Sequence, residues 1–271
     1  MKNLLSIILL TTSVFSQTIV WDSVDFPPSL IVKGELKNQG YSDKARTLMI
    51  NNLKQFTHKV QYINSARAIN NLKTKINHCF SGLNKNKKRE EFVYFSKPFI
   101  YSLPNELVIK KEDISKYTEY IDFEGFVDLD RLVENKNFQI AYTKERSYSK
   151  YIDKILDKHK GNKNLIYRPG SDLTKGFLKM LESNRADYII EYPIMVSFNS
   201  NKDYLSIPIK GSSSTLPVYI GCSKTEIGKN IIQKINNIID QNQQTLSSYY
   251  AQYLNINTQE RYLKNVQKYK N

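Results

Sequence analysis

KVQYINSARAINNLKTKINHCFSGL (59–83) is predicted to form a strand, a helix and a second strand in succession. The first strand, KVQYIN (59–64), ends at Ser65, which can cap the helix, and NHCFSGL (77–83) is the second strand. The apolar residues that recur at helical spacing between the strands are Ala66, Ile69 and Leu72. Two strands joined through a helix indicate a parallel β-α-β unit, and therefore an α/β fold.

The same alternation of strands and helices continues on both sides of this unit. The other predicted strands are TIVWDSV (18–24), FQIAYT (138–143), NLIYR (164–168), ADYIIEY (186–192) and LPVYIGCSK (216–224). Asp43 is expected to cap the helix that follows the first of them, and Ser147 the helix with the clearest amphipathic pattern. After residue 224 the chain is predicted to be helical, with one apolar stripe of Ile227, Ile231, Ile235 and Ile238.

Two extended segments divide this pattern into two halves. Phe99–Lys111 holds Pro104, and Leu205–Pro217 holds Pro208 and Gly211. Both are too short to be linkers, so we expect two crossings between two lobes, with a cleft at the hinge. In each lobe we expect a mostly parallel sheet flanked by helices. The predicted boundaries are 17–105 and 210–271 for lobe 1 and 106–209 for lobe 2.

The N-terminal segment 1–16 has the pattern of a secretory signal peptide. Lys2 precedes an apolar block, Leu4–Leu10, and residues 14–16 (VFS) form a cleavage site before Gln17. The block is too short to span a membrane. A buried first strand or helix is the alternative. Because no cysteine for lipid attachment lies nearby, the pattern predicts a periplasmic protein that does not span the membrane.

The composition is that of a basic globular protein. The 271 residues include 40 Lys and Arg against 26 Asp and Glu, a formal net charge of +14. This charge suits acidic partners, and export argues against nucleic acid. A solvated basic surface without a specific partner is the alternative. Two cysteines exclude a disulfide-dense scaffold, and three scattered histidines exclude most histidine-built metal sites.

Motifs of the common enzyme classes are absent from the sequence. GCSKTEIGKN (221–230) is similar to a phosphate-binding loop, but six residues separate its glycines and Asn230 follows its lysine. The phosphate loop requires four residues and a Ser or Thr. The chain holds no G-x-S-x-G, H-E-x-x-H or C-x-x-C motif. We therefore expect no metal, no cofactor and no catalytic residues.

Four stretches, in order along the chain, resemble the bacterial extracellular solute-binding protein family 3, the polar amino acid receptors of ABC transporters. They are IVWDSVDFPP (19–28), INSARAINNLKTKINHCFSGLNKNKKREEFVYFSKPF (63–99), RADYIIEYP (185–193) and PVYIGCSKT (217–225). The second contains the family's arginine, here Arg89, before an F-S-x-P motif. In detail the chain is most similar to a divergent, stand-alone branch of this family.

This resemblance implies a periplasmic binding protein of type II, whose two α/β lobes close over a small solute. It implies capture of a small anionic or zwitterionic, amino-acid-like solute in the interlobe cleft, for uptake or sensing. The implied partners are an ABC permease or a membrane sensor, and the implied state is a monomer without enzymatic activity. An enzyme on the same scaffold, such as a dehydratase of the cyclohexadienyl type, is the alternative.

Arg89 matches the family's arginine that pairs with the α-carboxylate of the solute. Its planar guanidinium suits this role because it can donate two parallel hydrogen bonds. Ser81 and Asn84 are further candidate contacts, although NKNKK (84–88) replaces the family's Thr/Ser-rich approach. The alternative is that KNKKREE (85–91) is a solvated helix start with ion pairs one turn apart.

Other candidate contacts follow from the same resemblance. Ser147 and Tyr148 match the place where the second lobe offers a helix N-terminus to an anion, with KER (144–146) as an insertion before them. The alternative is a plain cap at Ser147 and a core role for Tyr148. Asp25 and Phe26 are expected at an aromatic wall of the first lobe, where a ring can stack on a ligand.

The position of the family's amine-binding acid is ambiguous in this chain. Counting five residues from Asp187 reaches Tyr192, whereas Glu191 fits only with a one-residue gap. An acid there would pair with the ammonium of an amino acid. If Tyr192 holds the position, the ligand is not expected to be a free amino acid.

The two cysteines fall on strands that the resemblance assigns to the first lobe. In an oxidising compartment Cys79 and Cys222 are expected to form one disulfide. Two buried free thiols are the alternative. A disulfide would close a loop of about 140 residues, worth roughly 4–5 kcal/mol in the chain-entropy model.

Overall fold

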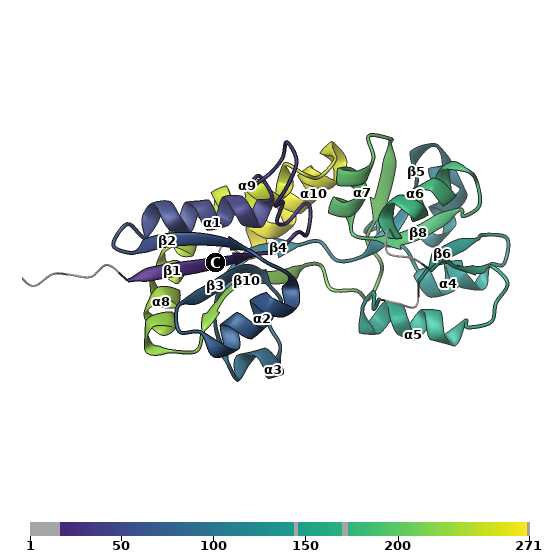
Figure 1. The fold of residues 1–271 in the computed structure, drawn as a ribbon. Helices are drawn as coiled ribbons and strands as arrows, with labels where there is room; N and C mark the ends of the chain where they lie inside the picture. Colours follow the sequence, from purple (N-terminus) through teal and green to yellow (C-terminus); the bar gives the residue numbers. More distant parts are fainter. Residues whose placement is uncertain (1–16, 144–145, 170–172, 270–271) are drawn as a thin grey trace, which may run out of the picture.

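The computed structural model describes residues 17–143, 146–169 and 173–269, which form two lobes (Figure 1). Each lobe is built on one five-stranded sheet flanked by helices. This confirms the predicted two-lobed α/β fold. The predicted signal peptide, 1–16, lies outside the described residues. No helix in the described part of the chain is long and apolar enough to cross a membrane.

The sheet of the first lobe has the strand order β2-β1-β3-β10-β4. Its strands are β1 (Thr18–Ser23), β2 (Thr57–Tyr62), β3 (His78–Leu83), β4 (Val93–Ser102) and β10 (Leu216–Ser223). β1 pairs in parallel with β2 and β3, so the predicted unit β2-α2-β3 is parallel, with β1 between its two strands. β10 runs antiparallel to both β3 and β4.

The sheet of the second lobe has the equivalent order β7-β6-β8-β5-β9. Its strands are β5 (Glu106–Lys110), β6 (Ile140–Tyr142), β7 (Leu165–Tyr167), β8 (Tyr188–Glu191) and β9 (Tyr204–Ile207). β6 pairs in parallel with β7 and β8, and β5 runs antiparallel to β8 and β9. Both sheets are therefore mixed, with four strands that run in one direction and one that is reversed. The reversed strand in each sheet, β10 or β5, enters directly from the other lobe without the crossover helix that a parallel neighbour requires.

Five helices accompany the first sheet. They are α1 (Tyr41–Asn52), α2 (Ser65–Thr74), α3 (Lys87–Glu90), α8 (Glu226–Gln241) and α9 (Gln243–Ala251). The predicted isoleucine stripe of α8 is confirmed, because Ile231, Ile235 and Ile238 are buried in the lobe's core. The predicted cap of α1 was wrong: Gly40 is the N-cap, and Asp43 accepts from its N–H at 3.2 Å from inside the first turn.

The described residues of the second lobe form five helical segments. They are η1 (Lys111–Tyr120), α4 (Leu129–Glu134), α5 (Lys150–Lys158), α6 (Leu173–Glu182) and α7 (Pro193–Asn199). The amphipathic pattern of α5 is confirmed by its buried face of Ile152, Ile155 and Leu156. Its cap is Ser149, two residues later than predicted, and Ser149 Oγ accepts from the N–H of Ile152 at 3.2 Å.

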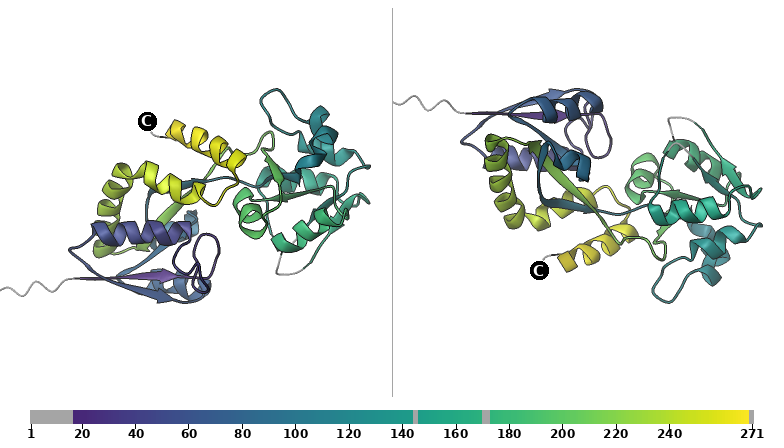
Figure 2. Two further views of the ribbon diagram at one scale, coloured as in Figure 1. Left: turned by 90° about the horizontal axis from the view of Figure 1, so that it is seen from above. Right: turned by 90° about the horizontal axis from the view of Figure 1, so that it is seen from below.

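The C-terminal helix lies at the junction of the lobes (Figure 2). α10 (Ile256–Val266), continued by η2 (Gln267–Tyr269), packs Tyr262 into the core of the first lobe. Its Arg261 donates to both carboxylate oxygens of Glu106, at the start of β5, at 2.8 and 2.6 Å. The backbone N–H of Asn255, just before α10, donates to Ser197 Oγ on α7. The helix therefore contacts both lobes beside the hinge.

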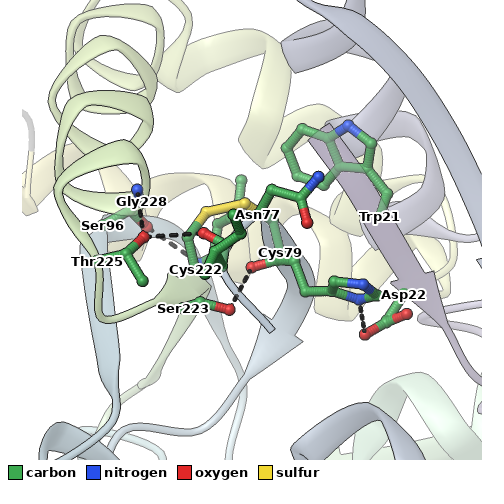
Figure 3. The surroundings of a disulfide bond; sticks show 12 residues. Trp21, Asp22, Asn77, Cys79, Ser96, Cys222, Ser223, Thr225 and Gly228 are labelled. Carbon is green, nitrogen blue, oxygen red and sulfur yellow. Dashed lines mark hydrogen bonds and ion pairs between the residues drawn. A yellow bond between two sulfur atoms is a disulfide. The ribbon is translucent and has the colours of Figure 1, made fainter. Parts of the chain in front are cut away.

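A disulfide joins two neighbouring strands of the first sheet (Figure 3). Cys79 on β3 and Cys222 on β10 face each other in register, with an S–S distance of 2.05 Å and a Cα–Cα distance of 4.1 Å. Both side chains are fully buried. The bond ties the strand that returns from the second lobe to the centre of the first.

Candidate ligand-binding cleft

A cavity of about 170 Å³ lies where the two lobes meet. Phe26, Gly82 and Asn84 line it from the first lobe, and Tyr192 and Met195 from the second. Ser102 and Leu103 of the first crossing, Leu216 of the second crossing and Val218 on β10 also line it. A solute in this cavity would contact both lobes and both crossings.

The loop after β1 forms one side of the cavity. The Phe26 N–H donates to the carbonyl of Leu30 at 2.9 Å, which closes a turn around the cis peptide between Pro27 and Pro28. The turn leaves the ring of Phe26 62% exposed at the cavity. An exposed aromatic side chain at this place has a face that can stack on a ligand.

Buried hydroxyl groups form the floor beneath this loop. Ser29 Oγ and Ser42 Oγ lie 2.8 Å apart, and Ser81 Oγ donates to the carbonyl of Ser42 at 3.2 Å. Ser81 is fully buried and lines none of the described cavities. The structure thus places Ser81 below the surface as a packing residue, and the neighbouring Gly82 faces the cavity instead.

Arg89 borders an adjoining cavity of about 170 Å³, which shares Phe26, Gly82 and Asn84 with the first. It lies on the short helix α3, where Asn86 Oδ1 accepts from its backbone N–H at 2.9 Å. Arg89 Nη1 donates to the carbonyl of Asn84 at 2.6 Å. The other guanidinium nitrogens make no hydrogen bond within the described part of the chain, so they are available to an anion.

Asp25 does not lie at this site. Its side chain pairs with Lys33 Nζ at 3.4 Å on the outside of the loop, and it lines none of the cavities described above. Of the two residues predicted for the first-lobe wall, the structure brings only Phe26 to the cleft.

Ser147 and Tyr148 precede α5, but its N-terminus already holds a carboxylate. Ser147 Oγ donates to Asp153 Oδ2, and the Tyr148 N–H donates to Asp153 Oδ1 at 2.9 Å. The Tyr148 hydroxyl accepts from the N–H of Thr143 at 3.0 Å, and burial raises its pKa. The predicted anion site at this helix end is therefore occupied by the chain's own Asp153.

Glu191 and Tyr192 differ in burial and in their position relative to the interlobe cavity. Glu191 ends β8 as a fully buried carboxylate that lines no described cavity, whereas Tyr192 lines the interlobe cavity. Arg146 Nη1 lies 3.0 Å from Glu191 Oε1, and Thr174 Oγ1 donates to Oε2 at 2.9 Å. Glu191 is thus neutralised inside the protein.

Arg146 is the partner of Glu191, and the sequence did not single it out as a candidate site residue. It is 45 positions from Glu191 in the chain, so no local pattern in the sequence predicts that the two residues form an ion pair. Its guanidinium lies 4.6 Å from the Tyr148 ring and 5.7 Å from the Tyr192 ring. The only local signal was its place in the three-residue insertion before Ser147.

A second buried carboxylate, Asp22, is structural. His78 Nδ1 lies 2.9 Å from Asp22 Oδ2, and Asn71 Nδ2 donates to both carboxylate oxygens at 3.2 and 3.3 Å. Burial raises the pKa of Asp22, and the hydrogen bond with His78 offsets only part of that rise. Asp22 lines none of the described cavities. No cluster of His, Cys, Asp and Glu among the described residues could hold a metal ion.

No protein-family model matches the sequence, and no curated protein matches it either. Solved structures do match its fold. The extracellular-binding protein ytmK of a probable amino-acid ABC transporter from Bacillus subtilis has a TM-score of 0.64 at 18% identity, covering 89% of this chain and 99% of its own. The fold is that of a type II periplasmic binding protein.

Two further structures with this type II fold also match over most of this chain and most of their own length. The second substrate-binding domain of GlnP from Lactococcus lactis, in an open conformation, has a TM-score of 0.65 at 13% identity, covering 90% of this chain and 97% of its own. The unliganded, open L-cystine solute receptor of Neisseria gonorrhoeae has a TM-score of 0.65 at 13% identity, covering 89% and 94%. The likeness concerns the fold, so the ligand must be argued from the residues of the cleft.

Proposed function

We propose that this protein captures a small anionic or zwitterionic solute between its lobes, as a periplasmic solute-binding protein. The solute would be handed to an ABC permease or reported to a membrane sensor. We also propose residues 17–105 and 210–271 as the first lobe and 106–209 as the second.

The observation that supports this proposal is the interlobe cavity. Its walls come from loops of the first lobe and from Tyr192 and Met195 of the second. A ligand that touches both walls binds the closed arrangement more tightly than the open one, and this difference in affinity drives closure.

The charge beside the cavity supports an anionic group on the solute. Arg89 borders the adjoining cavity and keeps part of its guanidinium available. A planar guanidinium can donate two parallel hydrogen bonds to a carboxylate. We propose Phe26, Asn84 and Tyr192 as the other contacts of the ligand.

An enzymatic role has less support in this cleft. A buried carboxylate next to a cavity is the usual candidate for a general acid or base. Here Glu191 is already paired with Arg146 and hydrogen-bonded by Thr174. We therefore propose binding without catalysis.

The direct test is a thermal-shift screen of the mature protein with amino acids, organic acids and peptidoglycan fragments, followed by calorimetry on the hits. X-ray scattering with and without the best hit should show a smaller radius of gyration in the complex. A hit that binds without any change in scattering would contradict capture by lobe closure.

Arg89→Ala should weaken binding of such a hit by about 2–5 kcal/mol, because the ligand's carboxylate would be left buried and unpaired. Lys87→Ala on the same helix is the matched control, since Lys87 is exposed and lines none of the described cavities. Equal affinity of both variants and the natural protein would remove Arg89 from the site.

A further inference from the structure

The carboxylate of Glu191 has all of its acceptor positions in use. Oε1 lies 3.0 Å from Arg146 Nη1 and accepts from the backbone N–H of Tyr192 at 2.8 Å. Oε2 accepts from Thr174 Oγ1 at 2.9 Å and lies 3.2 Å from Arg146 Nη1. A carboxylate offers about four such positions. An incoming ammonium group would therefore find no free acceptor on Glu191.

Arg146 is fixed by contacts other than Glu191. Its Nη2 donates to Asn105 Oδ1 at 3.2 Å and to the carbonyl of Ile190 at 3.1 Å. The ring of Tyr148 lies 4.6 Å from the guanidinium carbon. These contacts come from the hinge, from β8 and from the segment before α5. The guanidinium is thus held firmly in place as the cation that pairs with Glu191.

The pair lies next to a residue of the interlobe cavity. Tyr192 lines that cavity, and its ring lies 5.7 Å from the Arg146 guanidinium. The Arg146 side chain is 22% exposed, so its charge is only partly screened by water. Glu191 balances this charge, so the pair offers an ammonium group placed against Tyr192 neither a free acceptor nor a net negative charge.

We infer that Arg146 permanently fills the cationic place beside Glu191, and that the cleft therefore selects small organic acids without an amino group, such as 2-oxo or 2-hydroxy carboxylic acids. This inference rests on the proposed function and makes its ligand class narrower, because it excludes zwitterionic amino acids. The carboxylate of such an acid would pair with Arg89, and no ammonium partner would be required.

The test is calorimetry with matched pairs of solutes. Alanine, leucine, phenylalanine and glutamate are compared with their 2-oxo counterparts pyruvate, 4-methyl-2-oxopentanoate, phenylpyruvate and 2-oxoglutarate. We expect at least one oxo acid to bind ten-fold or more tightly than its amino acid. An amino acid that binds as tightly as its oxo counterpart would overturn the inference and leave the proposed function intact. Binding of none of the eight would overturn the inference, and the proposed function is then decided by the wider thermal-shift screen.

Variants of Arg146 and Glu191 test whether this ion pair causes the preference for an oxo acid over its amino acid. Arg146→Gln leaves Glu191 without a cation, so the preference for the oxo acid should fall at least ten-fold relative to the natural protein. Arg146→Gln combined with Glu191→Gln has no buried charge and should keep the preference. Arg131→Gln, an exposed arginine of the second lobe, is the charge-matched control. An unchanged preference in folded Arg146→Gln would overturn the role of Arg146, and the comparison of solutes with the natural protein stands if that variant fails to fold.

Discussion

Glu106 and Glu191 are direct partners in the antiparallel pairing of β5 with β8, and each is buried against its own arginine. Arg146 belongs to the same lobe as both carboxylates. Arg261 comes from α10, which packs on the first lobe. The Glu106–Arg261 pair therefore joins the C-terminal helix to the strand that begins the second lobe, whereas the Glu191–Arg146 pair lies within the second lobe.

Arg261→Met should lower the free energy of unfolding by about 3–5 kcal/mol at neutral pH, because it leaves Glu106 buried without its cation. Arg261→Met combined with Glu106→Gln should recover much of this loss. Denaturant unfolding followed by circular dichroism measures both. If Arg261→Met is as stable as the natural protein, the Glu106–Arg261 pair does not stabilise the fold.

The loss from Arg261→Met should also depend on pH. Burial raises the pKa of Glu106, and the hydrogen bonds from Arg261 oppose that rise. Without Arg261 the folded pKa moves further above the unfolded value, so the folded state binds the extra proton and becomes less stable as pH rises through this window. The destabilisation should therefore be larger at pH 8 than at pH 5. A loss that is the same at both values would contradict this account.

Much of the fold could be predicted because strand runs and helix stripes are local patterns. The limits of elements were less predictable where two residues that can cap a helix stand close together. Asn64 rather than Ser65 caps α2, and Ser149 rather than Ser147 caps α5. The backbone direction at the start of a helix decides between such neighbours, and it depends on tertiary packing.

The candidate site was predictable only in part. Phe26, Asn84 and Tyr192 follow or end strands at the cleft, and their positions were marked by motifs in the sequence. Ser81 was misjudged because adjacent residues of a strand point to opposite faces, so a one-residue difference moves a side chain from the cavity to the core. Arg146 required the fold itself, since its partner comes from a distant strand.

Removing the disulfide should lower the free energy of unfolding by about 5 kcal/mol, the chain-entropy value for a closed loop of this length. Cys79 and Cys222 are 143 positions apart. The variant with both residues changed to Ala is the appropriate one, because both sites are buried and Ala leaves no unpaired polar group. Reduction of the natural protein should give a similar loss in a denaturant titration. Equal stability with and without reductant would contradict the prediction.

Gly82→Ala should destabilise the fold by about 1–2 kcal/mol and also weaken ligand binding. Gly82 has φ +94°, where a side chain is strained, and an added Cβ would lie 3.1 Å from Ser42 Oγ and 3.3 Å from Ser29 Oγ. Gly161→Ala is the matched control, since Gly161 has φ +95° and open space around it. Both variants should lose stability, and only Gly82→Ala should lose affinity. If calorimetry gives Gly82→Ala and Gly161→Ala the same affinity for the ligand, Gly82 does not contribute to ligand binding.

Asp130→Asn should remove part of the acid sensitivity of the second lobe. Hydrogen bonds from Lys158 at 2.7 Å and His159 at 2.6 Å hold the pKa of Asp130 below its ordinary value of 3.8. A lowered folded pKa adds stability above pH 3.8 that disappears as pH falls through the folded value. The variant should therefore be less stable than the natural protein at pH 6, and the difference should shrink toward pH 3 in urea unfolding. Asp157→Asn, an exposed acid on α5, is the control and should show no such convergence; if it converges equally, net charge rather than the Asp130 contacts is responsible.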